Sequence, residues 1–302
     1  MTGPKPGQKT VLVTGCTPGG IGHAICLEYH RRGLHVIATA RRPEVLVELA
    51  EMGMSTVALD VTDAESIKQC HGEVAKINGG KLDILVNNAG RTHTHPALDI
   101  SLPDVRATFE TNVFSIMAMV QAFIDQLIAA KGLIINISSL SSITPYLFGS
   151  VYCASKAAVS AYSRTLRMEL APFGVRVMVA MTGTVKSNTA SQGHRVLPEN
   201  SLYRNVQSIF EWRLVFSQNN NTMDTPTFTR KLVANSLRPE RPGWLRSMFG
   251  RPDWFWSGGL AGLVWFGHCT GEWLVDAVCW RKFRMPEMVK LLGDDLTQKK
   301  LK

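Results

Sequence analysis

Apolar runs alternate with helical patterns between residues 10 and 181. The first run, residues 10–14, precedes a glycine cluster and a stretch in which Ile21, Ile25 and Tyr29 recur at helical spacing. Further apolar runs, rich in Val, Ile and Leu, follow at residues 35–39, 55–59, 84–87, 133–138 and 175–181. Such strands, alternating with helices, indicate a parallel sheet covered on both faces. We therefore predict a doubly wound α/β fold.

The alternation stops after about residue 185. Residues 187–202 are polar, residues 218–221 are rich in Asn, and prolines recur up to Pro252, so we predict a substrate lid over about 188–235. Residues 254–267 then form an uninterrupted apolar run, and six of the seven tryptophans lie between Trp244 and Trp280. These features predict an α/β domain over residues 1–250 and a distinct apolar, Trp-rich extension over 251–302.

Composition narrows the classes of protein to which the chain belongs. Hydrophobic residues make up 45% of the 302 residues and charged residues 19%, which excludes wholesale disorder. The net charge of +9 favours an anionic membrane surface or a phosphorylated ligand over nucleic acid, because the positive charge is dispersed and no stacking platform accompanies it. Six cysteines without a CxxC pair, and an N-terminus without an apolar signal segment, indicate the reducing, cytosolic side.

The glycine cluster, TGCTPGGIG at residues 14–22, lies between a strand and a helix. Backbone N–H groups and the helix dipole bind a pyrophosphate at such a junction, and side chains would obstruct it. The context predicts a Rossmann-type dinucleotide site, with Gly15, Gly20, Ile21 and Gly22 in the loop. Arg41 and Arg42 stand 19 and 20 residues beyond Gly22, where an acid would accept from a ribose hydroxyl. Arginine favours a 2′-phosphate, so we predict NADP(H).

Tyr152 and Lys156 are four residues apart in a stretch with helical spacing, so both project from one helix face. A phenol, with a reference pKa of about 10, is a weak acid near neutral pH, and a neighbouring ammonium stabilises its phenolate. Ser139 stands 13 residues before Tyr152, and Asn87-Asn88-Ala89-Gly90 closes the fourth predicted strand. With these motifs in this order, the chain resembles the short-chain dehydrogenase/reductase family over about residues 9–188.

The resemblance implies a role for each matching residue. Tyr152 would give a proton to a ketone oxygen, Ser139 would hydrogen-bond that oxygen, and Lys156 would bind the nicotinamide ribose. Asn112 would anchor a water in the proton path and Asp60 would accept from the adenine amine. Further cofactor contacts would come from Asn88, Ala89, Gly90, Val185 and Ser187.

Two departures from the family pattern stand out. The glycine loop carries one extra residue near Pro18 and Gly19, so we expect it to bulge. The family's Pro-Gly after the sixth strand is replaced by Thr182-Gly183, so we expect a looser turn. His93 and His95 alternate in a strand-like segment, but with no third ligand in evidence we expect a polar loop at the pocket rim and no metal.

The 14-residue apolar run is short of the roughly 20 residues that a membrane-spanning helix needs. Its tryptophans are typical of the membrane interface, and so are the arginines that flank it, Arg246, Arg251, Arg281 and Arg284. We predict a membrane-embedded hairpin or an interfacial helix. The alternatives are a helical cap over the active site and a contact between two copies of the chain in a homo-oligomer.

Within the family, the chain is most similar to the fungal NADPH-dependent 1-acyldihydroxyacetone-phosphate reductases, which are proteins of the endoplasmic reticulum and lipid droplets. The features that carry this resemblance are TGCTPGGIG, HVIATARRPE, LDVT and the Trp-rich tail. The resemblance implies reduction of a lipid-like ketone by a catalytic domain that faces the cytosol, with a cytoplasmic protein as the alternative. A ketoreductase of a fungal polyketide or terpenoid pathway and a steroid- or retinoid-type dehydrogenase are alternative activities. An NADPH-binding membrane scaffold without turnover is the alternative of another class.

Overall fold

Seven parallel strands form one sheet in the order β3-β2-β1-β4-β5-β6-β7. The computed structural model describes residues 3–187, 195–241 and 249–300. The strands are β1 (Thr10–Val13), β2 (His35–Ala40), β3 (Ser55–Ala58), β4 (Ile84–Asn87), β5 (Leu133–Ile137), β6 (Arg176–Thr182) and β7 (Trp254–Ser257). The first six coincide with the predicted runs to within about a residue or two, and the doubly wound α/β fold is confirmed.

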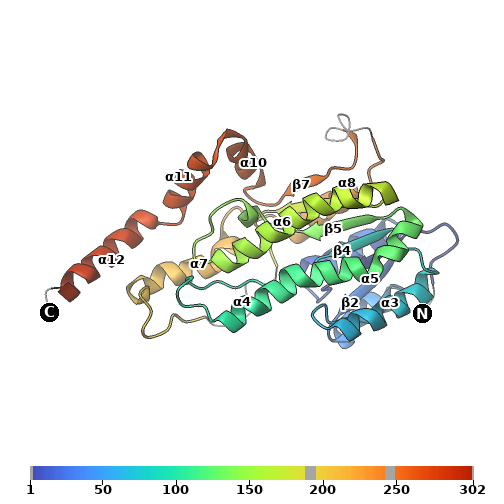
Figure 1. Cartoon of the computed structure of the whole chain (residues 1–302), viewed down its shortest axis with the longest axis horizontal. Coiled ribbons are helices and arrows are strands. Elements are labelled where there is room, and N and C mark those ends of the chain that lie inside the picture. Colours follow the sequence, from blue (N-terminus) through green and yellow to red (C-terminus); the bar gives the residue numbers. More distant parts are fainter. Residues whose placement is uncertain (1–2, 188–194, 242–248, 301–302) are drawn as a thin grey trace.

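Helices cover both faces of the sheet (Figure 1). They are α1 (Ile21–Arg31), α2 (Val47–Glu51), α3 (Ala64–Asn78), α4 (Leu102–Phe109), α5 (Ser115–Ala130), α6 (Ser150–Leu170), α7 (Gln207–Asn219), α8 (Thr225–Ser236), α10 (Ala261–Thr270), α11 (Glu272–Lys282) and α12 (Met285–Lys300). Ile25 of α1 and Phe228 of α8 belong to the core on one face of the sheet, with Val13 of β1. Phe123 of α5 and Leu166 of α6 belong to the core on the other face.

Local signals fix where several helices begin and end. The Asp63 carboxylate accepts the N–H groups of Glu65 and Ser66 at the start of α3, and Asp224 caps α8 in the same way. Gly79 ends α3 with a φ of +65°, a left-handed conformation that glycine adopts without strain.

The predicted domain boundary at residue 250 is too early, because β7 completes the sheet. Trp254–Ser257 pairs in parallel with Val179–Thr182 of β6, and Phe255 is buried against Phe228. The apolar run therefore divides into a core strand and the helix α10, and a membrane-embedded hairpin over the whole run is wrong. The interfacial helix remains a prediction for α10 and α11.

The segment that can form the predicted lid is shorter than residues 188–235. Residues 188–194 lie outside the described residues, and α8 packs against α1 as a core helix, with the Tyr29 hydroxyl 2.7 Å from Ser236 Oγ. The remaining segment contains α7, whose Phe210 packs with Phe148. Only the α7 region therefore lies where a lid is expected.

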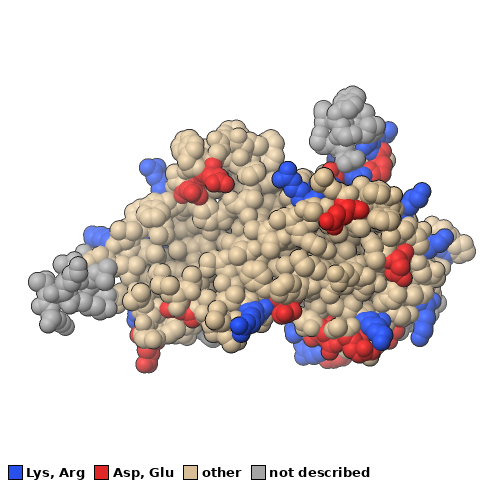
Figure 2. Space-filling view, viewed as in Figure 1, with Lys and Arg blue, Asp and Glu red and all other residues tan. Residues whose placement is uncertain are grey.

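The three C-terminal helices extend from the body at the end away from the N-terminus (Figure 1). Much of the surface over α6 carries few charged side chains, whereas charges gather near α3 (Figure 2). One continuous helical stretch, Leu102–Ala130, is long and apolar enough to cross a membrane. Its Met119, Phe123 and Leu127 are buried in the core against the sheet, which explains the hydropathy without a membrane.

Candidate active site

A continuous cavity of about 1280 Å³ runs along the carboxyl edge of the sheet. This is the edge where doubly wound folds bind their ligands. Most of the residues that the sequence singled out line it. They are Gly15, Gly20, Ile21, Arg41, Asp60, Asn88, Ala89, Gly90, Ser139, Tyr152, Lys156, Val185 and Ser187.

The glycine loop at the start of α1 leaves its backbone free of side chains. Gly15 has a φ of +73°, and a Cβ there would lie 3.0 Å from the Cα of Ala89. At Gly22 a Cβ would lie 2.4 Å from both the Gly15 oxygen and Asn88 Nδ2, so Gly22 serves close packing beneath the loop and does not line the cavity. The loop thus presents α1 N–H groups to an anion.

The extra residue in this loop is taken up by a tight turn. The Gly20 N–H donates to the Thr17 oxygen at 3.0 Å, and Gly19 lies at a φ of +74°. The α1 helix accordingly begins at Ile21, directly behind the turn. The expected bulge is therefore located at residues 17–20.

Thr14 ties the glycine loop to the loop after β4, a role that sequence reasoning missed. Its hydroxyl accepts the N–H groups of Asn88 and Ala89, each at 3.0 Å. In return, Asn88 Nδ2 donates to the Thr14 oxygen at 2.8 Å. The signal was present in the sequence as a polar residue at the end of an apolar strand.

The two arginines after β2 differ in position. Arg41 lines the cavity, whereas Arg42 does not and lies 3.9 Å from the Glu44 carboxylate on the surface. The turn therefore directs Arg41, and not Arg42, toward the cavity, and we retain Arg41 as the predicted contact of a 2′-phosphate. Burial acts to raise the pKa of Asp60, but hydrogen bonds from Thr62 and the charge of Arg41 outweigh it, so the pKa lies below its ordinary value.

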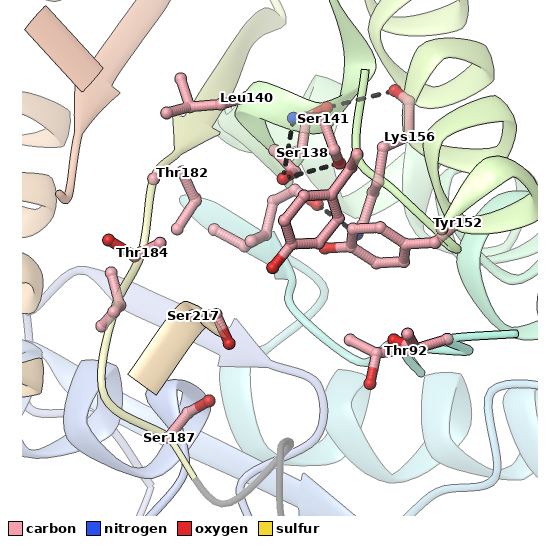
Figure 3. Close-up of a pocket in the computed structure, with 18 of the residues that line it drawn as sticks. Thr92, Ser138, Leu140, Ser141, Tyr152, Lys156, Thr182, Thr184, Ser187 and Ser217 are labelled. Atoms are coloured by element: carbon pink, nitrogen blue, oxygen red, sulfur yellow. Dashed lines mark hydrogen bonds between the residues drawn. The ribbon is translucent and has the colours of Figure 1, made fainter. Parts of the chain in front are cut away.

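Tyr152 and Lys156 lie on α6 at the middle of the cavity (Figure 3). Lys156 Nζ donates to the Ile137 oxygen at 2.8 Å and lies 5.9 Å from the centroid of the Tyr152 ring. Burial raises the pKa of Tyr152 to about 12, against the opposing effect of a hydrogen bond with Ser139, and burial lowers the pKa of Lys156 to about 8. Tyr152 therefore keeps its proton at neutral pH and is available as an acid.

Ser139 lies after β5 and is held by Ser141. The Ser139 hydroxyl oxygen accepts the Ser141 N–H at 3.2 Å and the Ser141 hydroxyl at 2.9 Å. Both bonds use its oxygen as acceptor, which leaves its own proton for the hydrogen bond with Tyr152 and, once a substrate is bound, for the substrate oxygen. The 13-residue spacing to Tyr152 selected Ser139 and not Ser141, yet Ser141 lines the cavity beside Ser138 and Leu140 (Figure 3).

Asn112 lies in a π-helical turn between α4 and α5 and is fully buried. Its Oδ1 accepts the Arg91 N–H at 2.8 Å, and its Nδ2 donates to the Arg91 oxygen and to Ser155 Oγ, each at 3.0 Å. These bonds occupy the side chain, and it does not line the cavity. Asn112 therefore holds the loop after β4 in place.

The sequence profile of the short chain dehydrogenase family matches residues 9–195. The chain belongs to this family. It is 40% identical over 274 residues to the short-chain dehydrogenase fogD of Aspergillus ruber, covering 90% of this chain and 89% of that one. It is 39% identical to the NADPH-dependent 1-acyldihydroxyacetone phosphate reductase of Schizosaccharomyces pombe, with 90% of each chain covered. A solved short-chain dehydrogenase from Streptomyces avermitilis matches with a TM-score of 0.75 and 29% identity, over 94% of this chain and 99% of that one.

In this short-chain dehydrogenase, the turn after β6 is held by hydrogen bonds in place of the family's proline. The Gly183 N–H donates to the Ser257 oxygen at 2.8 Å, and the Thr184 N–H to the Gly259 oxygen at 3.1 Å. A Cβ at Gly183 would lie 2.1 Å from the Gly259 oxygen, so glycine is required there. The turn that we expected to be loose is thus tied to the end of β7.

The histidines of the loop after β4 lie at the rim of the dehydrogenase cavity. The rings of His93 and His95 lie with their centroids 5.0 Å apart and their planes tilted by 36°, and His93 lines the cavity beside Thr92 and Thr94. Among the described residues, no three His, Cys, Asp or Glu side chains gather in a way that would hold a metal ion. The segment therefore forms part of the polar rim.

Beyond Tyr152 the cavity continues as an apolar arm, which the sequence did not locate. Helices α7, α10 and α11 form it, with Leu214, Phe216, Leu263, Val264, Phe266, Val275, Val278 and Phe283 in its lining. Leu263 and Phe266 are also 56% and 58% exposed, so the arm opens on the surface of the C-terminal helices. The C-terminal segment thus covers part of the active site, which was one of the alternatives that the sequence left open.

Proposed function

We propose that the chain is an NADPH-dependent reductase that converts the ketone of a lipid-like substrate to a secondary alcohol, with 1-acyldihydroxyacetone phosphate as the candidate substrate. The observation that carries the proposal is the position of Ser139, Tyr152 and Lys156 between the glycine loop and the apolar arm of a single cavity. A dinucleotide fits in the cavity on one side of these three residues, and an acyl chain fits on the other side.

The cofactor end suits a dinucleotide phosphate. The glycine loop offers a backbone cradle in which Gly15 and Gly20 line the cavity without side chains, and Gly22 packs beneath it. Arg41 supplies donors for a 2′-phosphate, and no acid stands at the end of β2 to repel it. Bound there, NADPH supplies the hydride for the ketone carbon. The Schizosaccharomyces pombe relative carries the NADPH requirement in its name.

The chain's own residues handle the proton and the orientation. Ser139 donates its O–H to the ketone oxygen and fixes its place, and Tyr152 delivers a proton to that oxygen as negative charge develops. The positive charge of Lys156, within 6 Å of the Tyr152 ring, stabilises the phenolate that remains.

The apolar arm and the C-terminal surface support a lipid substrate. Trp265, Trp273 and Trp280 are each at least half exposed, and they lie on the helices that border the mouth of the arm. Indole rings at this density favour the membrane interface. We propose that α10 and α11 lie on the endoplasmic reticulum membrane or a lipid droplet, with the catalytic domain in the cytosol.

The flanking arginines support this placement less than the sequence indicated. Arg246 lies outside the described residues, Arg251 is 3.7 Å from the Glu240 carboxylate, and Arg284 pairs with Glu287. Flotation with anionic vesicles tests the placement. A triple replacement of Trp265, Trp273 and Trp280 by Ala should reduce flotation at least about fivefold. Unchanged flotation of this variant would contradict the role of the tryptophans, and absent flotation of the wild type would favour a cytoplasmic protein.

A panel of ketones separates the activities. NADPH consumption is measured with 1-acyldihydroxyacetone phosphate, a steroid ketone and a polyketide ketone, and we expect the first to give the highest kcat/KM. A preference for the polyketide would indicate a secondary-metabolite ketoreductase, and one for the steroid would indicate a steroid-type dehydrogenase. Turnover of none of them would favour a scaffold that only binds NADPH.

A further inference from the structure

A buried arginine on α7 has no acidic partner among the residues that the structure describes. Arg213 is 2% exposed, and its guanidinium carbon lies 3.3 Å from the centroid of the Tyr146 ring. Phe216 and Phe283 complete the enclosure at 5.9 and 5.7 Å. A buried cation is normally paired, because taking a guanidinium out of water without a counter-charge is costly.

The hydrogen bonding of Arg213 is incomplete. Neither Nε nor Nη2 has a hydrogen-bond partner in the described part of the chain. These two nitrogens share one edge of the guanidinium plane, the edge that binds two oxygens of a phosphate or carboxylate through parallel bonds. The unused donors therefore form a matched pair.

Arg213 also belongs to the wall of the cavity that contains Ser139 and Tyr152. Arg91, Arg195 and Lys282 line the same cavity, whereas Asp60, at the cofactor end, is the one carboxylate among its described lining residues. The substrate end is consequently cationic. Burial lowers the pKa of Arg213, and the charge of Arg195 acts in the same direction.

The other cations at this end are already engaged. Arg91 Nη2 lies 3.4 Å from the Asp104 carboxylate, and Arg195 Nη2 donates to the Thr92 oxygen at 2.8 Å. The Lys282 ammonium lies 5.8 Å from the centroid of the Phe216 ring, nearer the apolar arm. Among them, Arg213 has the free bidentate edge.

We propose that Arg213 anchors an oxyanion of the substrate, a phosphate or carboxylate attached close to the reacting carbonyl. The proposal rests on the function proposed above and narrows its substrate class to anionic lipid ketones. The anionic group of the substrate lies on the Tyr146 side of Tyr152, and the acyl chain of the substrate enters the apolar arm. Because the free edge is buried, the guanidinium turns toward the cavity when the anion binds.

Calorimetric titration of the full chain with NADP⁺ present tests this without turnover. The probes are decyl phosphate, decanoate and 1-decanol, each below its micelle concentration. We expect decyl phosphate or decanoate to bind at least about tenfold more tightly than 1-decanol, and the better of the two identifies the oxyanion. In Arg213→Met that anion should lose about 10- to 100-fold in affinity, as expected for hydrogen bonds to a charged group, with 1-decanol within about threefold.

Two variants serve as controls. Arg230→Met removes an exposed arginine from α8 and should change neither affinity. Arg213→Lys keeps the charge but lacks the paired donors of the guanidinium, so its affinity for the anion should fall between those of wild type and Arg213→Met. This variant keeps the test decisive if the Met variant folds poorly. Equal binding of the anions and 1-decanol by the wild type, or unchanged anion binding in both Arg213 variants, would overturn the proposal.

The titration and the ketone panel distinguish failure of the anion site from failure of the proposed reductase activity. If the anion preference depends on Arg213 while no ketone is reduced, the anion site stands and the proposed reductase does not. If ketones are reduced while Arg213→Met lowers kcat/KM equally for a phosphorylated ketone and its dephosphorylated form, the reductase stands and the anchor is wrong.

Discussion

Tyr152 and Lys156 share one helix face but respond in opposite ways to burial. Burial raises the pKa of the Tyr152 phenol to about 12 and lowers the pKa of the Lys156 ammonium to about 8. In both cases the low dielectric disfavours the charged form. Burial of the Lys156 cation lowers the stability of the fold at neutral pH, and the same charge favours loss of the Tyr152 proton during reduction.

This arrangement predicts a pH dependence of stability. The unfolded chain keeps the Lys156 proton up to about pH 10, whereas the folded chain releases it near pH 8, so the unfolded state binds more protons in this interval. The free energy of unfolding should therefore rise with pH across it, by roughly 2–3 kcal/mol. Urea unfolding of wild type and Lys156→Met from pH 7 to 10 isolates the effect. A stability difference between the two proteins that stays constant with pH would contradict it.

The arginines after β2 give a second test at this scale. Arg41 lines the cavity and Arg42 faces Glu44. Replacing Arg41 by Ala should raise the KM for NADPH about 10- to 100-fold, by loss of charge-assisted hydrogen bonds, and leave the KM for NADH within about threefold. The matched variant Arg42→Ala should change neither constant more than about threefold. Equal effects of the two variants would mean that the turn after β2 is oriented differently.

At the scale of elements, β7 shows where sequence reasoning stopped short. Residues 254–257 stand at the head of a longer apolar run that contains four glycines, and hydropathy does not distinguish a core strand from a membrane segment of that length. Only pairing with β6, at a sequence separation of about 75 residues, makes it a strand. Such long-range pairing is not encoded in a local pattern.

The position of β7 predicts different roles for two nearby aromatic residues. Phe255→Ala removes a side chain that is 6% exposed in the core, and should lower the free energy of unfolding by about 3–5 kcal/mol. Trp273→Ala removes one that is 72% exposed on α11, and should change it by less than about 0.5 kcal/mol. Denaturant unfolding of both variants measures this. Similar losses would mean that α11 is packed as tightly as the sheet.

The site was more predictable than the elements around the substrate. The glycine loop, Ser139, Tyr152 and Lys156 stand at fixed spacings within single elements, so their convergence follows from the fold. Arg213 escaped notice because a lone arginine on a helix reads as a surface residue, and only the folded chain buries it. The direction of Arg42 depended on one turn, which the sequence does not determine.

At the scale of the whole molecule, the charge of +9 is shared between different surfaces and sites. Arg41 lies at the cofactor end of the cavity and Arg213 at the substrate end, whereas α10 carries no Asp, Glu, Lys or Arg. The hydrophobic excess is likewise divided between two sheet cores and an exposed aromatic surface at the mouth of the arm. Both distributions agree with an enzyme that takes an anionic lipid from a membrane.

Proton donation by Tyr152 is the step on which the proposed ketone reduction depends most. Its most direct test is NADPH consumption with 1-acyldihydroxyacetone phosphate by wild type and Tyr152→Phe, alongside NADPH binding by fluorescence. We predict turnover by the wild type and a loss of at least about 100-fold in kcat in the variant, the range of general acid catalysis, with the Kd for NADPH within about threefold. Equal turnover by the two proteins, or none by either, would contradict the account.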